Sequence, residues 1–293
     1  MPCQAPVSII ITVKNSGVDL FMTMESLKVS HTRLPYEVII VNEDSIDGCC
    51  DFLMNYKFQQ PVKLLKGQKG LPSRNLAAAH ASGKYLIFCS PRLYFEDDWM
   101  ELLLMPVMAG EADCASPQLT IHESSRMKPH CSYEGAFLHS VQSFPWTGHG
   151  DELSWLSWEC FAVSRAKFQE IGGMEEGFHS KELEAVEFSL RMWLLGGSCR
   201  LVSGVSLKVV FRQNFPYDDS GNQWGEDLMS ISYLHFNDAR IVNNRRLVSQ
   251  VFGENILQNE NAILDRTTLS REKYAIRRIR DDSWFFQHFG IPV

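Results

Sequence analysis

The chain has 293 residues, of which 45% are hydrophobic and 22% are charged, and its formal net charge is −7. This composition excludes a disordered chain and supplies enough apolar residues for one large α/β core. Nucleic acid is excluded as a partner, because phosphate binding requires clustered basic residues. The one basic cluster, residues 273–280, alternates with apolar residues and is interpreted as the solvated face of a helix.

The eight cysteines include no C-x-x-C pair, so their spacing does not predict a zinc site. Several lie in apolar runs, as buried thiols do in a reducing compartment. Residues 1–6 lack the basic start of a secretory signal, and the apolar run Val7–Val13 is too short to span a bilayer. We therefore expect a cytoplasmic protein with no integral membrane segment.

The first half of the chain alternates predicted strands with predicted helices. Unbroken apolar, β-branched runs predict strands buried on both faces, as in a parallel sheet. The strands are expected at Val7–Val13, Tyr36–Val41, Val62–Leu65 and Lys84–Cys89. Helices are expected at Val18–Val29, Ile46–Tyr56 and Ser73–Ala81, the last capped by Ser73. This alternation predicts a doubly wound α/β fold with right-handed crossovers.

Polar, turn-forming residues follow each of these four strands. They are residues 12–15, 42–47, 67–70 and 90–92. Ligands of doubly wound sheets bind beyond the carboxyl ends of the strands. Four such loops on one edge therefore predict a ligand site there.

The second half is expected to begin with a loop-rich segment, Pro117–Leu153, that holds up to two strands. A strand at Trp158–Ser164 and short strands at 201–202 and 206–211 should follow. Helices are expected at Arg165–Ile171, Glu182–Leu195, Met229–Phe236, Ala239–Phe252 and Arg271–Phe289. We expect residues 1–217 to form the α/β domain and residues 218–293 to form a helical C-terminal extension packed on it.

Four stretches of the first half resemble the family-two glycosyltransferases in order and spacing. Val7–Asn15 resembles their first strand, and Val38–Gly48 resembles the second strand with its V-D-D-x-S-x-D-G loop. Gly70–Ala77 is similar to a G-x-x-x-A-R-N helix start, and Gly83–Phe88 to the strand before a D-x-D motif. The second half is similar to the polypeptide N-acetylgalactosaminyltransferases. The matching segments there are Phe161–Arg165, Ile171–Gly173, Gly177-Phe178, Glu184–Trp193, Gly196-Gly197, Phe211-Arg212 and Pro216-Tyr217.

This resemblance, which covers roughly residues 7–217, implies a GT-A-type, Rossmann-like mixed sheet flanked by helices. It also implies a nucleotide-sugar donor, with UDP favoured. Backbone groups of Thr12 and Val13 would read the edge of the base, and Asn42, Glu43 or Asp44 would bond the base or ribose. Arg74 would reach the base or a phosphate.

The family's D-x-D metal motif falls at Ser90-Pro91-Arg92, and the metal-binding His of the polypeptide transferases falls at Val209. A lone hydroxyl is a poor ligand and Arg repels a cation, so the ligands for Mg²⁺ or Mn²⁺ are lost. We assign Ser90 and Arg92 to donor binding; no cofactor is assigned, and Mg²⁺ or Mn²⁺ stays an open alternative although the family's ligands are missing. The nearby acids 96–98 are interpreted as the first turn of a helix at Asp97–Leu104.

The family's catalytic E-D pair falls at Glu184 and Ala185, which leaves Glu184 as the candidate base. Glu182 points about 200° away on a helix. Glu187 is expected to pair with Arg191, four residues on, in a structural role.

Two further residues are assigned to the acceptor side or a lid. Trp224 is expected in a mobile loop, Gly221–Gly225, and Arg212, with Lys208, is expected to assist Arg92. A guanidinium matches phosphate geometry well, so Arg92 could replace the metal.

Two functions remain open. The first is a metal-independent glycosyltransferase acting on the hydroxyl of an unknown glycan, peptide or small-molecule acceptor. The second is a catalytically inactive pseudo-glycosyltransferase that serves as a binding or scaffold protein. A nucleotidyltransferase is disfavoured, because no glycine-rich loop with a basic residue stands at the N-terminus.

Overall fold

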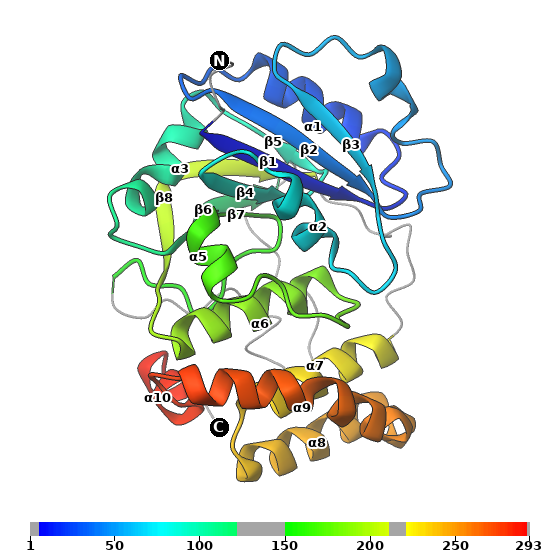
Figure 1. The fold of residues 1–293 in the computed structure, drawn as a ribbon, viewed down its shortest axis with the longest axis vertical. Coiled ribbons are helices and arrows are strands. Elements are labelled where there is room, and N and C mark those ends of the chain that lie inside the picture. Colours follow the sequence, from blue (N-terminus) through cyan, green and yellow to red (C-terminus); the bar gives the residue numbers. More distant parts are fainter. Residues whose placement is uncertain (1–5, 122–149, 211–220, 292–293) are drawn as a thin grey trace. The chain divides into compact units, whose positions relative to one another are not determined.

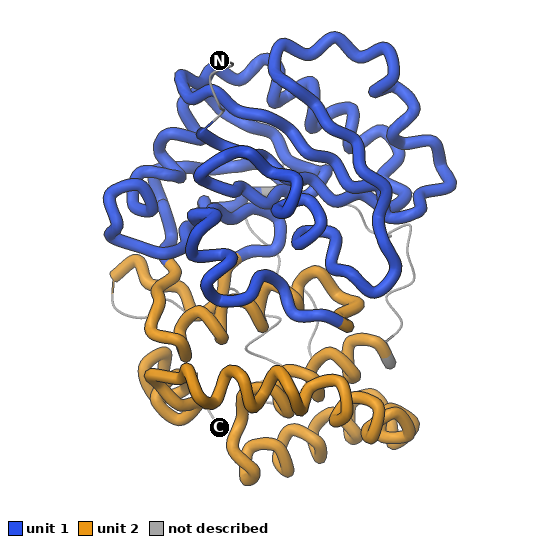
Figure 2. Tube along the Cα trace, in the orientation of Figure 1, with its two compact units in different colours: residues 1–127, 157–176, 200–218 blue, residues 128–156, 177–199, 219–293 orange. Residues whose placement is uncertain are grey.

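The computed structural model describes residues 6–121, 150–210 and 221–291 (Figure 1). The chain forms two compact units (Figure 2). The first comprises residues 1–127, 157–176 and 200–218, and the second comprises residues 128–156, 177–199 and 219–293. The domain boundary expected at residue 217 stays a prediction.

An eight-stranded sheet organises the first unit, with strand order β3-β2-β1-β4-β7-β6-β8-β5. Strands β1 to β4 run parallel, and β4 to β7, β7 to β6 and β5 to β8 are antiparallel. The bounds are β1 Val7–Val13, β2 Tyr36–Asn42, β3 Val62–Lys66, β4 Tyr85–Cys89, β5 Leu93–Tyr94, β6 Cys114–Ile121, β7 Cys160–Ser164 and β8 Cys199–Val209. The predicted mixed α/β fold class is confirmed.

Both faces of the central strands are buried, which explains their unbroken apolar sequences. On one face, Val7, Ile9 and Ile11 pack with the apolar sides of α1 (Asp19–Val29) and α3 (Trp99–Met108). The opposite face is covered by α2 (Ser73–His80) and α5 (Arg165–Glu170) (Figure 1). There the ring of Phe88 lies 5.2 Å from that of Phe168.

Three local expectations for the first unit are wrong. Pro72, not Ser73, is the N-cap of α2. The helix expected at 46–56 is reduced to a 3₁₀ helix, η1 (Asp51–Asn55), because the Asp47 carboxylate binds the Cys49 N–H and Gly48 takes φ +70° in a turn. Helix α3 begins at Trp99 rather than Asp97, since Asp98 has left-handed backbone, φ +55°.

Strand β8 also differs from its prediction, because the two short strands expected at 201–202 and 206–211 form one continuous strand. Its residues Lys208 and Val209 pair with β5. Gly204 is not among the glycines with left-handed backbone, so the strand continues through it.

The second unit contains six helices in the part of the chain that the structure describes. They are α6 (Lys181–Leu194), α7 (Gly221–His235), α8 (Asp238–Phe252), η2 (Glu254–Asn259), α9 (Glu260–Arg277) and α10 (Asp282–His288). A helical C-terminal region is thereby confirmed. The single helix expected at 271–289 is divided, because the Asp281 side chain caps α10 by accepting the Trp284 N–H at 2.7 Å.

The basic cluster at 273–280 is not simply a solvated face. Arg278 donates to the carbonyl of His235, and Arg280 donates to the carbonyls of Trp193 and Gly197. The Arg280 guanidinium also lies 4.2 Å from the Trp284 ring centroid. These two arginines therefore tie the chain between α9 and α10 to α6 and α7.

Among the helices described, none is long and apolar enough to cross a membrane.

Candidate functional site

The loops that follow β1 and β2 are joined by hydrogen bonds at one edge of the sheet. The Asn15 N–H donates to Ser45 Oγ at 3.0 Å, and the Ile46 N–H donates back to Asn15 Oδ1 at 2.9 Å. The Gly17 N–H binds the Asp47 carboxylate at 2.7 Å. This reciprocal bonding holds the two loops in one arrangement, as a preformed ligand site requires.

Four of the predicted donor residues lie at this edge. Thr12 and Val13 end β1, and the Val13 carbonyl accepts the Glu43 N–H at 2.8 Å. Asn42 ends β2, and its Oδ1 accepts the Ser45 N–H at 2.8 Å. Asp44 is exposed, in left-handed backbone. The parallel pairing of β1 and β2 thus brings backbone and side-chain groups for a base or ribose together.

The other predicted donor residues gather around a carboxylate that sequence reasoning did not single out, Glu159. Ser90 Oγ donates to Glu159 Oε2, and Arg92 Nη2 donates to Glu159 Oε1. The antiparallel register explains this meeting, because Cys89 of β4 pairs with Cys160 of β7. The Ser90 N–H donates to the Glu159 carbonyl at 2.8 Å, which extends that register by one residue.

Trp158 and Arg74 complete this group. The Arg92 guanidinium lies 5.1 Å from the centroid of the Trp158 ring, and Arg74 Nη2 donates to the Trp158 carbonyl at 3.0 Å. The Arg74 guanidinium also lies 5.6 Å from the Phe161 ring. Aromatic faces attract cations, so both arginines are held on aromatic surfaces near the end of β4.

Burial dominates the electrostatics of this group. Ser90, Arg74, Arg92 and Glu159 are each less than a tenth exposed. Burial raises the pKa of Glu159, while the charge of Arg92, the Ser90 hydrogen bond and the charge of Arg74 act in the opposite direction. The carboxylate is therefore held by both D-x-D-equivalent side chains.

These side chains do not fit a divalent cation. Mg²⁺ and Mn²⁺ sites require several anionic or neutral oxygen ligands, whereas Arg92 is itself a cation. Each oxygen of Glu159 already accepts a hydrogen bond. Val209 pairs with Leu93, next to Arg92, and offers no ligand. In the described ranges, no group of three His, Cys, Asp or Glu side chains is placed to hold a metal.

The candidate base, Glu184, lies in the first turn of α6 and is 3% exposed. Nearby, the predicted structural pair of Glu187 and Arg191 is confirmed. Arg191 Nε and Nη2 each donate to the Glu187 carboxylate at 2.8 Å, and both side chains are fully buried. Two parallel hydrogen bonds of this kind fix the geometry of both groups.

His235 completes the buried ion pair. Its Nε2 lies 2.8 Å from Glu187 Oε1, and Arg278 Nη2 lies 3.4 Å from its Nδ1. These partners assign the ring as neutral, with the proton on Nε2. Burial, opposed by the hydrogen bond to Glu187, lowers the pKa of His235. Although Glu187 is buried, Arg191 and His235 lower its pKa to about 2.

The loop conformation expected around Trp224 is wrong. Residues 221–235 form α7, so Trp224 lies within a helix and not in a loop. A Cβ on Gly225 would lie 2.5 Å from Ile256 Cδ1, so this glycine permits close packing and is not a hinge. Arg212 lies outside the described residues. Lys208 is half exposed and lies 3.6 Å from Glu96.

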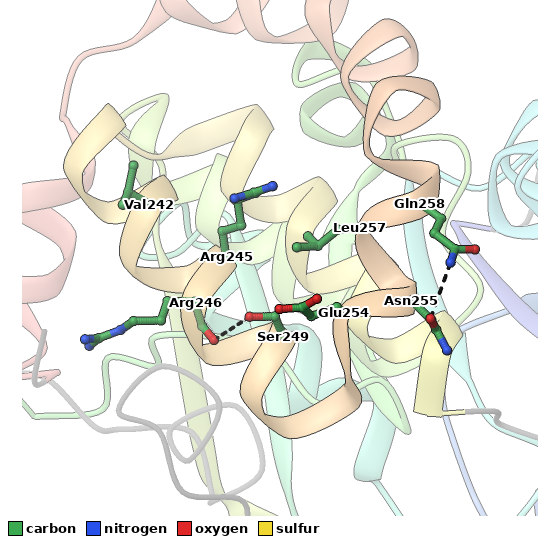
Figure 3. Close-up of a pocket in the computed structure, with 8 residues that line it drawn as sticks. All are labelled: Val242, Arg245, Arg246, Ser249, Glu254, Asn255, Leu257 and Gln258. Carbon is green, nitrogen blue, oxygen red and sulfur yellow. Dashed lines mark hydrogen bonds between the residues drawn. The ribbon is translucent and has the colours of Figure 1, made fainter.

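A pocket of about 720 Å³ lies in the second unit, between α8 and η2 (Figure 3). Its lining residues are Val242, Arg245, Arg246, Ser249, Glu254, Asn255, Leu257 and Gln258. Arg245 donates to both oxygens of Glu260, at 2.8 and 3.0 Å. None of these residues belongs to the predicted site, so the pocket is not assigned to the donor.

Comparison with known proteins connects this geometry to one family. Residues 8–171 match the model of glycosyl transferase family 2. Polypeptide N-acetylgalactosaminyltransferase 11 of Xenopus tropicalis is 26% identical over 78% of this chain and 41% of its own length. The inactive polypeptide N-acetylgalactosaminyltransferase-like protein 5 of Macaca fascicularis is 25% identical over 71% of this chain and 53% of its own length.

A solved structure shares the fold. The crystal structure of GalNAc-T7 with UDP, GalNAc and Mn²⁺ aligns with all of this chain over 59% of the GalNAc-T7 chain. The TM-score is 0.69 and the sequence identity is 15%. The chain spans about two fifths of the length of several of the curated relatives that it matches.

Proposed function

Because this chain belongs to glycosyl transferase family 2, we propose that it transfers a sugar from a nucleotide-sugar donor, a UDP-sugar, to an acceptor hydroxyl. The observation that carries the proposal is the common edge where β1, β2 and β4 end. The loops that follow β1 and β2 are joined by hydrogen bonds, and Arg92 follows β4. A nucleoside diphosphate needs such a combination of polar groups and positive charge.

We assign the base and ribose to Thr12, Val13, Asn42 and Asp44, whose backbone and side-chain groups lie at the ends of β1 and β2. One supporting bond lies within the loop after β2, from the Ser45 N–H to Asn42, and another joins the two loops, from the Ile46 N–H to Asn15, which keeps the edge ordered before a ligand binds. Arg74 and Arg92 would then face the diphosphate.

In the proposed reaction, the bond from the anomeric carbon to the diphosphate oxygen breaks, and the diphosphate keeps the electron pair. The acceptor oxygen forms the new bond to this carbon, and its proton passes to a general base, for which Glu184 is the candidate from the sequence. The departing diphosphate gains negative charge. A buried guanidinium aimed at that charge stabilises the transition state without a metal.

We propose that the reaction proceeds without a divalent cation at the end of β4. Support comes from the chemistry of the side chains there, since Ser90 and Arg92 hold a carboxylate rather than presenting carboxylates. The test is release of UDP from UDP-sugars in the presence of a chelator, for wild type and Arg92→Ala. Turnover that persists in chelator and falls at least about tenfold in the variant supports the proposal. A requirement for added Mn²⁺, or unchanged turnover in Arg92→Ala, refutes it.

A second function keeps the fold and loses the chemistry. Two observations favour it, namely the near-complete burial of Glu184 and the similarity to a relative whose own name describes it as inactive. In this case the chain would bind a nucleotide, glycan or peptide as a scaffold. Isothermal titration with UDP and UDP-sugars separates the two functions when it is combined with product analysis. Binding without hydrolysis or transfer supports the scaffold, and any transfer excludes it.

A further inference from the structure

We propose that Glu159 is a positioning residue, which holds Arg92 as a built-in replacement for a metal cation at the end of β4. This inference rests on the proposed function and extends it to a residue that neither the sequence motifs nor the proposed site includes. The Glu159 carboxylate contacts both side chains at the D-x-D-equivalent positions, Ser90 and Arg92.

The charges suggest how this arrangement works. In a metal site, protein carboxylates fix a cation so that it can face phosphate oxygens. Here the carboxylate of Glu159 fixes a cation that belongs to the protein, the guanidinium of Arg92. As in a metal site, a carboxylate holds a positive charge, but here the positive charge is part of a side chain of the protein.

The backbone makes the pairing specific. Glu159 directly precedes β7, and Ser90 directly follows β4, where the Cys89–Cys160 pairing places them opposite one another. The Ser90 N–H donates to the Glu159 carbonyl, so the backbone from which the Glu159 side chain extends is also fixed. Ser90 Oγ donates a hydrogen bond to Oε2 of the Glu159 carboxylate, and Arg92 Nη2 donates to the other oxygen, Oε1.

A second contact restrains the guanidinium from another side. The Trp158 ring lies 5.1 Å from the centre of the Arg92 guanidinium, and its carbonyl accepts a hydrogen bond from Arg74. Arg92 is 7% exposed, so few other rotamers are open to it. A guanidinium held in this way has lost its side-chain entropy before a diphosphate binds, which is the advantage of preorganisation.

The first test measures UDP binding by isothermal titration in chelator. Glu159→Gln keeps the size of the side chain but removes the charge that holds Arg92. We expect UDP affinity to fall by about tenfold, the effect of one charge-assisted hydrogen bond, with no recovery on adding Mn²⁺. Glu37→Gln, which removes a buried carboxylate paired with Lys63 at the opposite end of β2, serves as the matched charge-removal control. Wild-type UDP affinity in folded Glu159→Gln overturns the inference.

The second test needs no nucleotide and measures Mn²⁺ binding alone, by electron paramagnetic resonance. In Arg92→Asp, the new carboxylate lies beside Ser90 and Glu159, a set of oxygen ligands that suits Mn²⁺. We expect this variant to bind Mn²⁺ at least about tenfold more tightly than wild type, and the double variant Arg92→Asp, Glu159→Gln to lose that gain. Equal Mn²⁺ binding by the single and double variants overturns the inference.

The two tests fail in different ways if the proposed function is wrong. A wild-type protein that binds no UDP, with or without Mn²⁺, refutes the donor site. The Mn²⁺ measurements on the Arg92 variants still decide the role of Glu159, because they depend only on the side chains around β4 and β7. Circular dichroism of each variant confirms that the fold is retained.

Discussion

The ion pair of Glu187 and Arg191 allows a sharp prediction about stability. Both side chains are fully buried, and Glu187 is also bonded to His235. Replacing Glu187 by Gln leaves the Arg191 guanidinium in the interior without its anionic partner. Breaking a buried pair from one side is strongly destabilising, because an uncompensated charge stays in a medium of low dielectric constant.

The magnitude follows from the pKa of Glu187, which falls from 4.5 to about 2 in the folded protein. At about 1.4 kcal/mol for each pH unit, this difference corresponds to about 3 kcal/mol of folding free energy at neutral pH. The lowered pKa means that the unfolded state binds more protons between pH 4.5 and 2. The stabilisation is therefore complete above pH 4.5 and is lost as the pH falls toward 2.

Urea unfolding of Glu187→Gln and wild type at pH 7, 5 and 3 tests this reasoning. We expect the variant to be about 3 kcal/mol less stable at pH 7 and 5, with a smaller difference at pH 3. Glu25→Gln, which breaks an exposed pair with Lys28, is the control and should leave the midpoint unchanged. A loss below about 0.5 kcal/mol at pH 7, or a loss that does not depend on pH, refutes the reasoning.

Three further predictions concern packing, the loops and His235. Gly225→Val should lower the free energy of unfolding by about 2 kcal/mol, because the new valine side chain would overlap Ile256 and Phe252. Gly204→Val, whose side chain would meet no neighbouring atom, is the control and should cause no such loss. Thermal unfolding of the two variants makes the comparison. Asp47→Ala should destabilise by about 1 kcal/mol in urea, since Gly17 and Cys49 each lose a bond; a change no larger than that of Asp44→Ala would contradict this. Because the pKa of His235 is lowered in the folded protein, its contribution to the free energy of unfolding is complete above about pH 6.5 and falls at lower pH. Replacing His235 by Gln should therefore make the free energy of unfolding depend less on pH below about 6.5. An unchanged pH dependence would count against the neutral assignment of the ring.

The sheet, and the edge at which β1 and β2 end, were accessible from the sequence because they depend on local pattern. Five of the seven residues of Val7–Val13 are apolar, with only Ser8 and Thr12 between them, and such a β-branched run without strict alternation favours a strand buried on both faces. The polar residues after β1 and β2 then lie at one edge because parallel strands share their direction. The fold and the meeting of these two loops therefore followed from strand identity, whereas donor binding at this edge stays a prediction.

Glu159 was not accessible in this way. Its partners, Ser90 and Arg92, are 69 and 67 residues away, and they meet it through the antiparallel register of β4 with β7. No local period encodes that register. The one available signal is an acid wedged between Trp158 and an apolar strand, which predicts a buried charge that requires a partner.

The lid around Trp224 failed for a different reason. Two glycines in five residues favour a loop, but Gly225 is buried in α7 because Ile256 and Phe252 leave no room for a side chain. Tertiary packing thus overrides a local preference. The break between α9 and α10 had a usable signal, since Asp281 stands just where an N-cap is preferred.

The central claim is that this edge of the sheet binds a nucleotide-sugar donor without a divalent cation. The most direct measurement is the dissociation constant of UDP for the wild-type chain, determined by isothermal titration in chelator and again with Mn²⁺ in excess. We predict binding in chelator, with a dissociation constant that changes by less than about twofold when Mn²⁺ is added, because in the proposed site the guanidinium of Arg92 supplies the positive charge. Binding that appears only with Mn²⁺, or no binding in either condition, would contradict it.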